Sequence, residues 1–146
     1  MIGLLQRVSR ASVECAGAEI ARIGPGLLVF VGIERADDDA RADRLLERLL
    51  GYRVFPDDSG RMNRSLRDVD GGLLLVPQFT LVADTASGLR ASFSPAAAPA
   101  DGERLFESLC ARAAAAWPRT ARGRFGADMQ VSLVNDGPVT FWLEAC

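Results

Sequence analysis

The spacing of apolar and polar residues predicts more strands than helices in this chain. Apolar and polar positions alternate imperfectly over residues 2–13, which is typical of a strand with one buried face. Residues 27–33 are continuously apolar, rich in β-branched side chains, and preceded by the turn-forming Gly24-Pro25-Gly26. This run predicts a strand buried on both faces. Further strand signals lie at residues 19–23, 52–55, 73–76, 122–133 and 139–143.

Two other segments have helical periodicity. Residues 37–50 place leucines on one stripe behind three aspartates, whose carboxylates suit a helix N-terminus. Residues 101–117 form a second apolar stripe, and the preceding residues 83–100, rich in Ala, Ser, Pro and Gly, predict a long loop. Because strands and helices do not alternate, we expect an α+β fold. It would be a single domain over residues 1–146, with mixed or antiparallel sheets curled into a barrel-like core and two main helices.

The composition removes several catalytic chemistries. All 17 positively charged residues are arginine, and neither lysine nor histidine occurs. A Ser-His-Asp triad, a Cys-His pair, a P-loop lysine, a Schiff base and a histidine-ligated zinc site are therefore excluded. Any catalysis must use carboxylates, hydroxyls, amides, backbone groups or the substrate itself.

Charge and cysteine content set further expectations. A net charge of −2 gives no overall basic footprint for non-specific nucleic-acid binding. Cys15, Cys110 and Cys146 are scattered and odd in number, which indicates a reducing compartment. The longest apolar stretch is about half of a membrane span. We therefore expect a cytoplasmic protein with no membrane partner, no metal and no cofactor.

Residues 76–81 interrupt a buried strand with polar chemistry. Pro77 lacks an N–H group and is expected at a strand end, which places Gln78, Phe79 and Thr80 at the mouth of that strand. Exposed backbone N–H groups there could serve as an oxyanion hole. From the residues alone, a strand end with a polar side chain in solvent is the simpler interpretation.

Residues 135–140 are the second unusual segment. Asn135, Asp136, Gly137 and Pro138 are all turn formers, so a plain hairpin turn is the simplest interpretation of them. The Gly137-Pro138 bond could also be cis, which would turn two carbonyl groups in an unusual direction. Local sequence does not determine the isomer.

These segments, with five others in the same order, resemble the D-aminoacyl-tRNA deacylase family from end to end. The segments that carry the resemblance are Gln6–Val13, Gly26–Val29, Leu50–Phe55, Gly60–Asn63, Gln78–Leu81, Gly123–Met129 and Asn135–Thr140. Position 77 departs from the family pattern, because proline stands where the family signature has serine. A Pro-Gln opening is associated with a related branch that acts on tRNA mischarged with L-alanine. That branch has alanine after the glutamine, whereas this chain keeps Phe79.

The resemblance implies a hydrolase. Its substrate would be the ester that joins a D-amino acid, or glycine, to the 3′ end of tRNA. It also implies a homodimer with two active sites at the subunit interface. In that dimer a cis Gly137-Pro138 segment would enter the partner's site, where its carbonyl groups hold the substrate α-amino group. An L side chain would collide with this segment, whereas a D side chain would point to open space.

A mechanism without histidine or lysine is chemically coherent for such a substrate. The ester is already labile, and the neighbouring ribose 2′-hydroxyl can activate water, so the RNA supplies the missing base. We expect the N–H groups of Phe79 and Thr80 to stabilise the oxyanion and Gln78 to orient the ribose or the ester. Thr80 as a nucleophile is the competing mechanism, although a threonine needs an activating base that the sequence does not supply.

Four other residues are assigned supporting places. We expect Pro77 and Met129 to line the substrate pocket, and Arg7 and Phe125 to support the Gly-Pro segment. Ordinary packing or a surface salt bridge explains Arg7, Phe125 and Met129 equally well. The arginines could include a patch for the tRNA phosphates, because arginine suits bidentate phosphate contacts.

Three other functions stay open at this point. The chain could be a non-catalytic dimeric RNA-binding module, which its near-neutral charge and the absence of serine at position 77 favour. It could be a deacylase of wider range that also clears L-alanyl esters, and residue 77 is the feature that discriminates this alternative. A metal-dependent hydrolase is the weakest alternative, because the acidic residues look like helix caps and loop residues.

Overall fold

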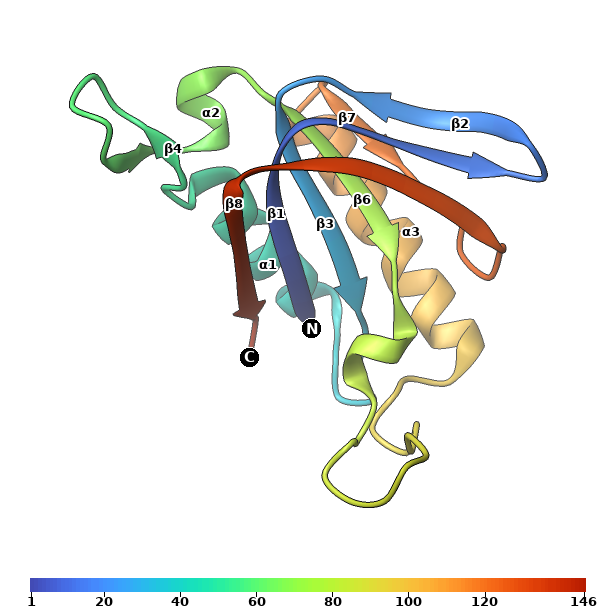
Figure 1. Cartoon of the computed structure of the whole chain (residues 1–146). Coiled ribbons are helices and arrows are strands. Elements are labelled where there is room, and N and C mark those ends of the chain that lie inside the picture. Colours follow the sequence, from blue (N-terminus) through green and yellow to red (C-terminus); the bar gives the residue numbers. More distant parts are fainter.

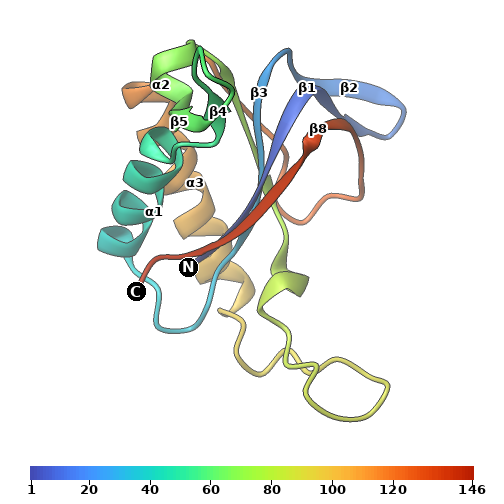
Figure 2. The same ribbon diagram turned by 60° about the vertical axis from the view of Figure 1, so that its left-hand side comes forward.

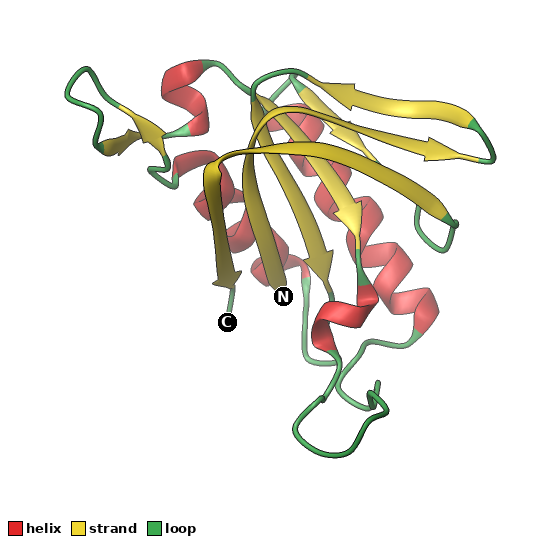
Figure 3. Ribbon diagram, in the orientation of Figure 1, coloured by secondary structure: helices red, strands yellow, loops and turns green.

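The computed structural model describes residues 1–146 and has an α+β fold in which helices cover one face of a curled sheet (Figures 1 and 3). The strands are β1 (Ile2–Cys15), β2 (Ala18–Ile23), β3 (Gly26–Gly32), β4 (Phe55–Pro56), β5 (Met62–Arg64), β6 (Gly72–Pro77), β7 (Thr120–Arg122) and β8 (Met129–Glu144). The helices are α1 (Asp39–Gly51), α2 (Leu66–Val69), the 3-10 helix η1 (Phe79–Val82) and α3 (Pro99–Ala116). No helix is both long and apolar enough to cross a membrane.

The main sheet has six strands and mixed direction. Its strand order is β2-β1-β3-β6-β7, and β8 pairs with β1. The β1 strand is antiparallel to β2, β3 and β8, whereas β3–β6 and β6–β7 are parallel. The first half of β1 pairs with β3 and its second half with β2, so the sheet turns along this one strand and curls into a nearly closed barrel. The predicted fold class is confirmed.

Two apolar cores hold the layers together. The larger core lies between the sheet and the two long helices, α1 and α3, which run side by side on one face of the sheet (Figure 2). It includes the buried leucines of α1 and Leu105, Phe106 and Leu109 of α3. The smaller core, with Val13, Leu28 and Leu74 among its members, fills the concave side of the curled sheet. Alternate residues of the central strands therefore serve different cores, which explains their continuous apolar character.

Close backbone approach determines where β3 and β6 begin. Gly26 and Gly72 are paired residues of the parallel β3–β6 ladder. A Cβ atom on Gly26 would lie 2.0 Å from the carbonyl oxygen of Gly72. Glycine is required at this position because two backbones meet there, and the pair sets the register that carries β6 to its end at Pro77.

Several predicted boundaries were wrong. The expected strand at 52–55 is reduced to Phe55–Pro56, which pairs with a β5 strand that the sequence did not predict. The expected strand over 122–133 is interrupted, because β7 ends at Arg122, Phe125 lies in a turn, and β8 begins only at Met129. The helix α3 begins at Pro99 rather than at residue 101, since proline is favoured in the first helical turn.

Candidate active site

The mouth of β6 is where the first unusual segment lies. The Gln78 N–H group donates to the carbonyl oxygen of Val31 at 2.8 Å, so the strand keeps its pairing with β3 one residue beyond Pro77. The chain then turns directly into η1. Phe79 and Thr80 are the first two residues of this helix, so their N–H groups have no acceptor within it. Phe79 is also 58% exposed and Thr80 is exposed, so this segment lies at the surface.

The side chains of Gln78 and Thr80 are held together. The Gln78 Nε2 atom donates a hydrogen bond to the Thr80 Oγ1 atom at 2.5 Å. This is the one hydrogen bond that the Thr80 hydroxyl makes, and its partner is an amide rather than a base. The contact orients the Gln78 amide relative to the free N–H groups and leaves Thr80 without an activating group.

A cavity of about 430 Å³ adjoins this backbone. It is mostly apolar and takes residues from β6, from the segment before α3, and from the turn and start of β8. Its lining includes Pro77, Gln78, Phe79, Pro99, Phe125 and Met129. Phe125 packs against Phe106 of the core, with ring centroids 6.3 Å apart. The Met129 sulfur accepts from the backbone N–H of Arg124 at 3.4 Å. Five of the predicted site residues therefore meet here, and Thr80 follows directly.

No acidic side chain lines this cavity. Four carboxyl groups have a lowered pKa because each accepts hydrogen bonds elsewhere in the fold. They are Asp39 with Ser108, Asp57 with Asn63, Asp68 with the Ser65 backbone, and Glu107 with Arg122. These carboxylates cap turns and pair with arginines. No group of three or more Cys, Asp or Glu side chains comes together that could hold a metal ion.

The second unusual segment forms a wide bulge in β8, so the expected hairpin turn is wrong. On one side of the bulge Asn135 pairs with Val8 of β1, and on the other side Thr140 pairs with Gln6 of the same strand. The chain therefore leaves the ladder and returns to it without reversing. The Asn135 side chain closes the base of the bulge, because its Oδ1 accepts from the Val139 N–H at 3.1 Å and its Nδ2 donates to Thr140 Oγ1 at 2.9 Å.

The Gly137-Pro138 peptide bond at the tip of the bulge is cis. Gly137 has a φ angle of +132°, a backbone conformation that L side chains rarely adopt. Both residues are exposed to solvent. The two turn formers therefore serve to project backbone out of a sheet edge rather than to reverse the chain.

Arg7 supports this bulge from β1. Its Nε atom donates to the carbonyl oxygen of Asp136 at 3.0 Å, and its Nη1 atom donates to the carbonyl oxygen of Val54 at 2.7 Å. The Arg7 side chain is only 13% exposed. It thus bridges the bulge to the segment between α1 and β4.

Within one chain, the two unusual segments lie apart. Val131 is the last residue of β8 that lines the cavity, and the four residues from there to Asn135 span about 13 Å at ~3.3 Å per residue. In Figures 1 and 2 the bend of β8 lies near the end of the sheet opposite η1. Neither Gly137 nor Pro138 lines any of the four main cavities. Phe125 lies at the cavity with Gln78, whereas Arg7 lies at the bulge.

Strand β8 carries exposed apolar side chains close to the bulge. Val134, Phe141 and Trp142 are 39%, 36% and 49% exposed, and they flank the bulge on both sides. The outer edge of β8 has no strand partner within the chain, since β8 pairs only with β1. A long, unpaired and partly apolar edge strand is typical of a surface that another chain covers.

Sequence reasoning missed the residues that complete the walls of the cavities. Ala96, Ala97 and Pro99 lie in the segment that was expected to be a long loop, and they line two adjoining cavities. The only signal available was the length of that loop. Its path could not be inferred, because it depends on backbone contacts with the residues directly after β3, such as that of Ala97 N–H with the carbonyl oxygen of Ile33 at 3.0 Å.

Comparisons with known proteins give a consistent result. The family model described as D-Tyr-tRNA(Tyr) deacylase matches residues 4–144. A D-aminoacyl-tRNA deacylase of Stutzerimonas stutzeri is 65% identical over 145 residues, which are 99% of this chain and 100% of that protein. The corresponding protein of Alkalilimnicola ehrlichii is 63% identical and covers 99% of this chain and 97% of its own length.

Solved structures agree with these relatives. A structure described as the c-Myc DNA unwinding element binding protein has a TM-score of 0.95 and 35% identity, covering 100% of this chain and 99% of its own. A probable eukaryotic D-amino acid tRNA deacylase has a TM-score of 0.86 at 17% identity, covering 98% of both chains. The second likeness is one of fold alone.

Proposed function

The chain belongs to the D-aminoacyl-tRNA deacylase family, and from this premise we propose that it hydrolyses the ester of D-aminoacyl-tRNA at the mouth of β6. The observation that carries the proposal is the pair of N–H groups of Phe79 and Thr80, which have no acceptor within η1 and lie beside a cavity without acid or base. Such a site suits a substrate that needs orientation and charge stabilisation more than proton transfer from the protein.

The reaction proceeds with the substrate's own hydroxyl as the proton carrier. Water adds to the ester carbonyl carbon while the ribose 2′-hydroxyl accepts its proton and passes a proton to the departing 3′-oxygen. The carbon–oxygen ester bond breaks, and the products are a free D-amino acid and tRNA. The N–H groups of Phe79 and Thr80 stabilise the oxyanion, and each such donor contributes about 3 kcal/mol in known acyl-transfer sites. The Gln78 amide orients the ribose or the ester.

The competing covalent mechanism would use Thr80 Oγ1 as the nucleophile. Its hydroxyl accepts a hydrogen bond from Gln78 Nε2, and an amide cannot remove its proton. The absence of His and Lys from the chain and of carboxylates from the cavity lining leaves no general base for this route. We therefore assign Thr80 a positioning function through its side chain and an oxyanion-binding function through its backbone.

The active enzyme is a homodimer in this proposal. The Gly137-Pro138 bulge of one subunit enters the partner's cavity, where its carbonyl groups hold the substrate α-amino group. The separation of the bulge from its own chain's cavity supports this arrangement, as do the exposed apolar side chains close to the bulge. With the amino group and ester both fixed by rigid backbone, an L side chain would point into the bulge and be rejected. Glycine would be accepted, because it has no side chain to reject.

Pro77 bears on how wide the substrate range is. It lines the cavity directly beside Gln78 and offers no hydroxyl to the substrate. Pro77 therefore favours one alternative function, which is a deacylase that also clears L-alanyl esters. Phe79 favours the D-specific branch, since its ring occupies the wall where the other branch has a small side chain.

Parallel deacylation of D-Tyr-, L-Tyr-, Gly- and L-Ala-tRNA tests the proposal. We expect hydrolysis of the D-Tyr and Gly esters only, and that hydrolysis should persist in EDTA. Hydrolysis of L-Ala-tRNA by the wild-type protein would establish the wider range if Pro77→Ser lowers the rate on L-Ala-tRNA more than the rate on D-Tyr-tRNA. Binding of tRNA without hydrolysis of any ester would contradict the enzyme assignment and favour a binding module.

A further inference from the structure

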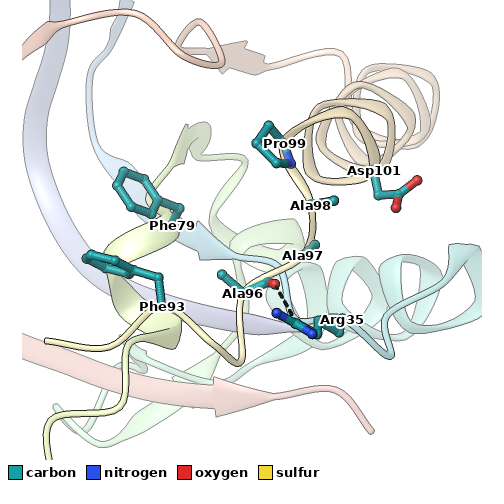
Figure 4. A pocket seen from close by; sticks show the side chains of 8 residues that line it. All are labelled: Arg35, Phe79, Phe93, Ala96, Ala97, Ala98, Pro99 and Asp101. Atoms are coloured by element: carbon teal, nitrogen blue, oxygen red, sulfur yellow. Dashed lines mark hydrogen bonds between the residues drawn. The ribbon is translucent and has the colours of Figure 1, made fainter.

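The cavity on the other side of Phe79 has no function in the reaction described above. It measures about 660 Å³ and is lined by Arg35, Phe79, Phe93, Asp101 and the segment from Ala96 to Pro99. Figure 4 shows the two phenylalanine rings together on one side, the alanine segment across the middle, and the charged residues on the far side. The volume lies within the range of small-molecule sites.

The aromatic pair forms an exposed ledge. The rings of Phe79 and Phe93 are tilted, with centroids 5.1 Å apart. Phe79 is 58% and Phe93 is 44% exposed, although both are large apolar side chains. Exposed aromatic rings on a rigid backbone are what single-stranded nucleic-acid sites use to stack bases.

The ledge is rigid because backbone bonds fix the loop that carries Phe93. Asp84 and Ser92 exchange two N–H to carbonyl bonds, of 2.8 and 3.0 Å. Beyond Phe93, the Arg35 N–H donates to the carbonyl oxygen of Pro95 at 3.1 Å, which ties the loop to the segment between β3 and α1. The position of Phe93 is therefore set by the fold rather than by loop flexibility.

Arg35 supplies a free positive charge on the opposite wall. Its Nε atom donates to the carbonyl oxygen of Ala96 at 3.3 Å, which fixes the guanidinium at the cavity (Figure 4). No carboxylate forms a salt bridge with it, whereas most neighbouring arginines on α1 and α3 are paired with aspartates or glutamates. Its two Nη groups are free to bind an anionic group such as a phosphate.

This cavity adjoins the candidate active site. Phe79, Ala96, Ala97 and Pro99 line both cavities, so a polymer whose terminal unit lies beside Gln78 would have its next units on the aromatic ledge. We propose that the ledge of Phe79 and Phe93, with Arg35, is a second nucleotide subsite, which stacks a base and binds the phosphate of a nucleotide preceding the aminoacylated one. The inference rests on the proposed function, because it extends the same substrate away from the ester.

Two substrates separate this subsite from the ester site: D-tyrosyl-tRNA and D-tyrosyl-adenosine, which lacks the preceding nucleotides. In Phe93→Ala we expect kcat/KM for the tRNA to fall about tenfold relative to that for the adenosine ester, and Phe93→Tyr should restore the ratio. The slope of log KM for tRNA against log salt concentration reports the number of phosphate contacts. Arg35→Gln should reduce this slope by the contribution of about one phosphate contact. Arg61→Gln, an exposed arginine in the β4–β5 turn, is the matched control and should change neither quantity.

Direct binding tests the subsite without requiring hydrolysis. The probe is the trinucleotide CCA, compared with adenosine in calorimetry, and Phe93→Ala should weaken the trinucleotide alone about tenfold. Equal losses for both substrates, or no loss for either, would overturn the inference. The inference would also be overturned if Phe93→Ala lowered kcat/KM for D-tyrosyl-adenosine but not for D-alanyl-adenosine. The ledge would then hold the amino-acid side chain. A wild-type protein that binds the trinucleotide as expected but hydrolyses no ester would contradict only the proposed function.

Discussion

The Arg7 Nε atom donates to the carbonyl oxygen of Asp136 at 3.0 Å and thereby ties the bulge of β8 to the strand that it leaves. The same guanidinium reaches the carbonyl oxygen of Val54 at 2.7 Å. One largely buried arginine therefore fixes the backbone directly before Gly137 against the segment between α1 and β4. The contact links a residue of the first strand to the segment that we propose enters the partner's active site.

Replacing Arg7 by alanine should loosen this segment without unfolding the protein. The loss of hydrogen bonds from a charged donor, with the Val54 carbonyl left unsatisfied, should cost about 1–3 kcal/mol in urea denaturation. The rate of D-Tyr-tRNA deacylation should fall by a larger factor than the fraction of unfolded protein at the assay temperature explains. Arg10→Ala on the same strand is the control, because Arg10 is exposed and makes no side-chain hydrogen bond. Equal effects of the two variants would refute the support function.

Gly137→Ala should disable the bulge selectively. A Cβ atom there would lie 2.8 Å from Val139 Cγ2 and 3.0 Å from Arg7 Nη2, at a φ of +132°. We expect kcat/KM for D-Tyr-tRNA to fall about tenfold to a hundredfold, because small displacements of binding groups are that costly. Gly17→Ala, at a φ of +80° with open space around it, should leave activity intact. Unchanged turnover in Gly137→Ala would remove the bulge from the site.

Thr80→Ala should retain substantial deacylation. The substitution removes the hydrogen bond from Gln78 Nε2, a contact worth about 1 kcal/mol net, and leaves the Thr80 N–H group in place. The rate should therefore fall by less than about tenfold, and Thr80→Ser should recover most of it. Single-turnover rates and tRNA binding should be measured together. Near-total loss with binding intact would support the covalent mechanism instead.

Mixing two impaired variants tests whether the site is shared between subunits. One variant carries Gly137→Ala and the other carries Gln78→Ala, so each homodimer has two damaged sites. Subunit exchange should restore about a quarter of the wild-type rate, because half of the dimers are mixed and each contains one intact site. No recovery, despite mixed dimers in native mass spectrometry, would place both segments in the same subunit's site.

The cysteines should differ sharply in reactivity. Burial raises the pKa of the Cys110 thiol to about 12, so almost no thiolate exists at neutral pH. Cys15 is also buried, whereas Cys146 is exposed. Titration of the native protein with a disulfide reagent at pH 8 should modify Cys146 alone, and all three thiols should react in urea. Rapid native labelling in Cys146→Ser would contradict the burial of Cys15 and Cys110.

Local patterns predicted the elements whose burial is uniform along the chain. The leucine stripe of α1 and the apolar run of β3 were placed within about two residues, because each buries one repeating face or both faces in a core. Short elements without such a stripe, among them α2, η1 and β5, were not predicted. Their formation depends on caps and contacts, such as the reciprocal bonds between Ser65 and Asp68 at the start of α2.

The tertiary structure decided the form of the site. Asn135 to Pro138 have the composition of a hairpin turn, and only the pairing of both flanks with β1 makes the segment a bulge. The cavity likewise depends on the curl of the sheet, which brings Met129 to Pro77 and Pro99. The sequence by itself determined the chemistry, since a chain without His or Lys offers backbone donors and arginines. Where those groups meet depends on long-range strand pairing, which local periodicity does not encode.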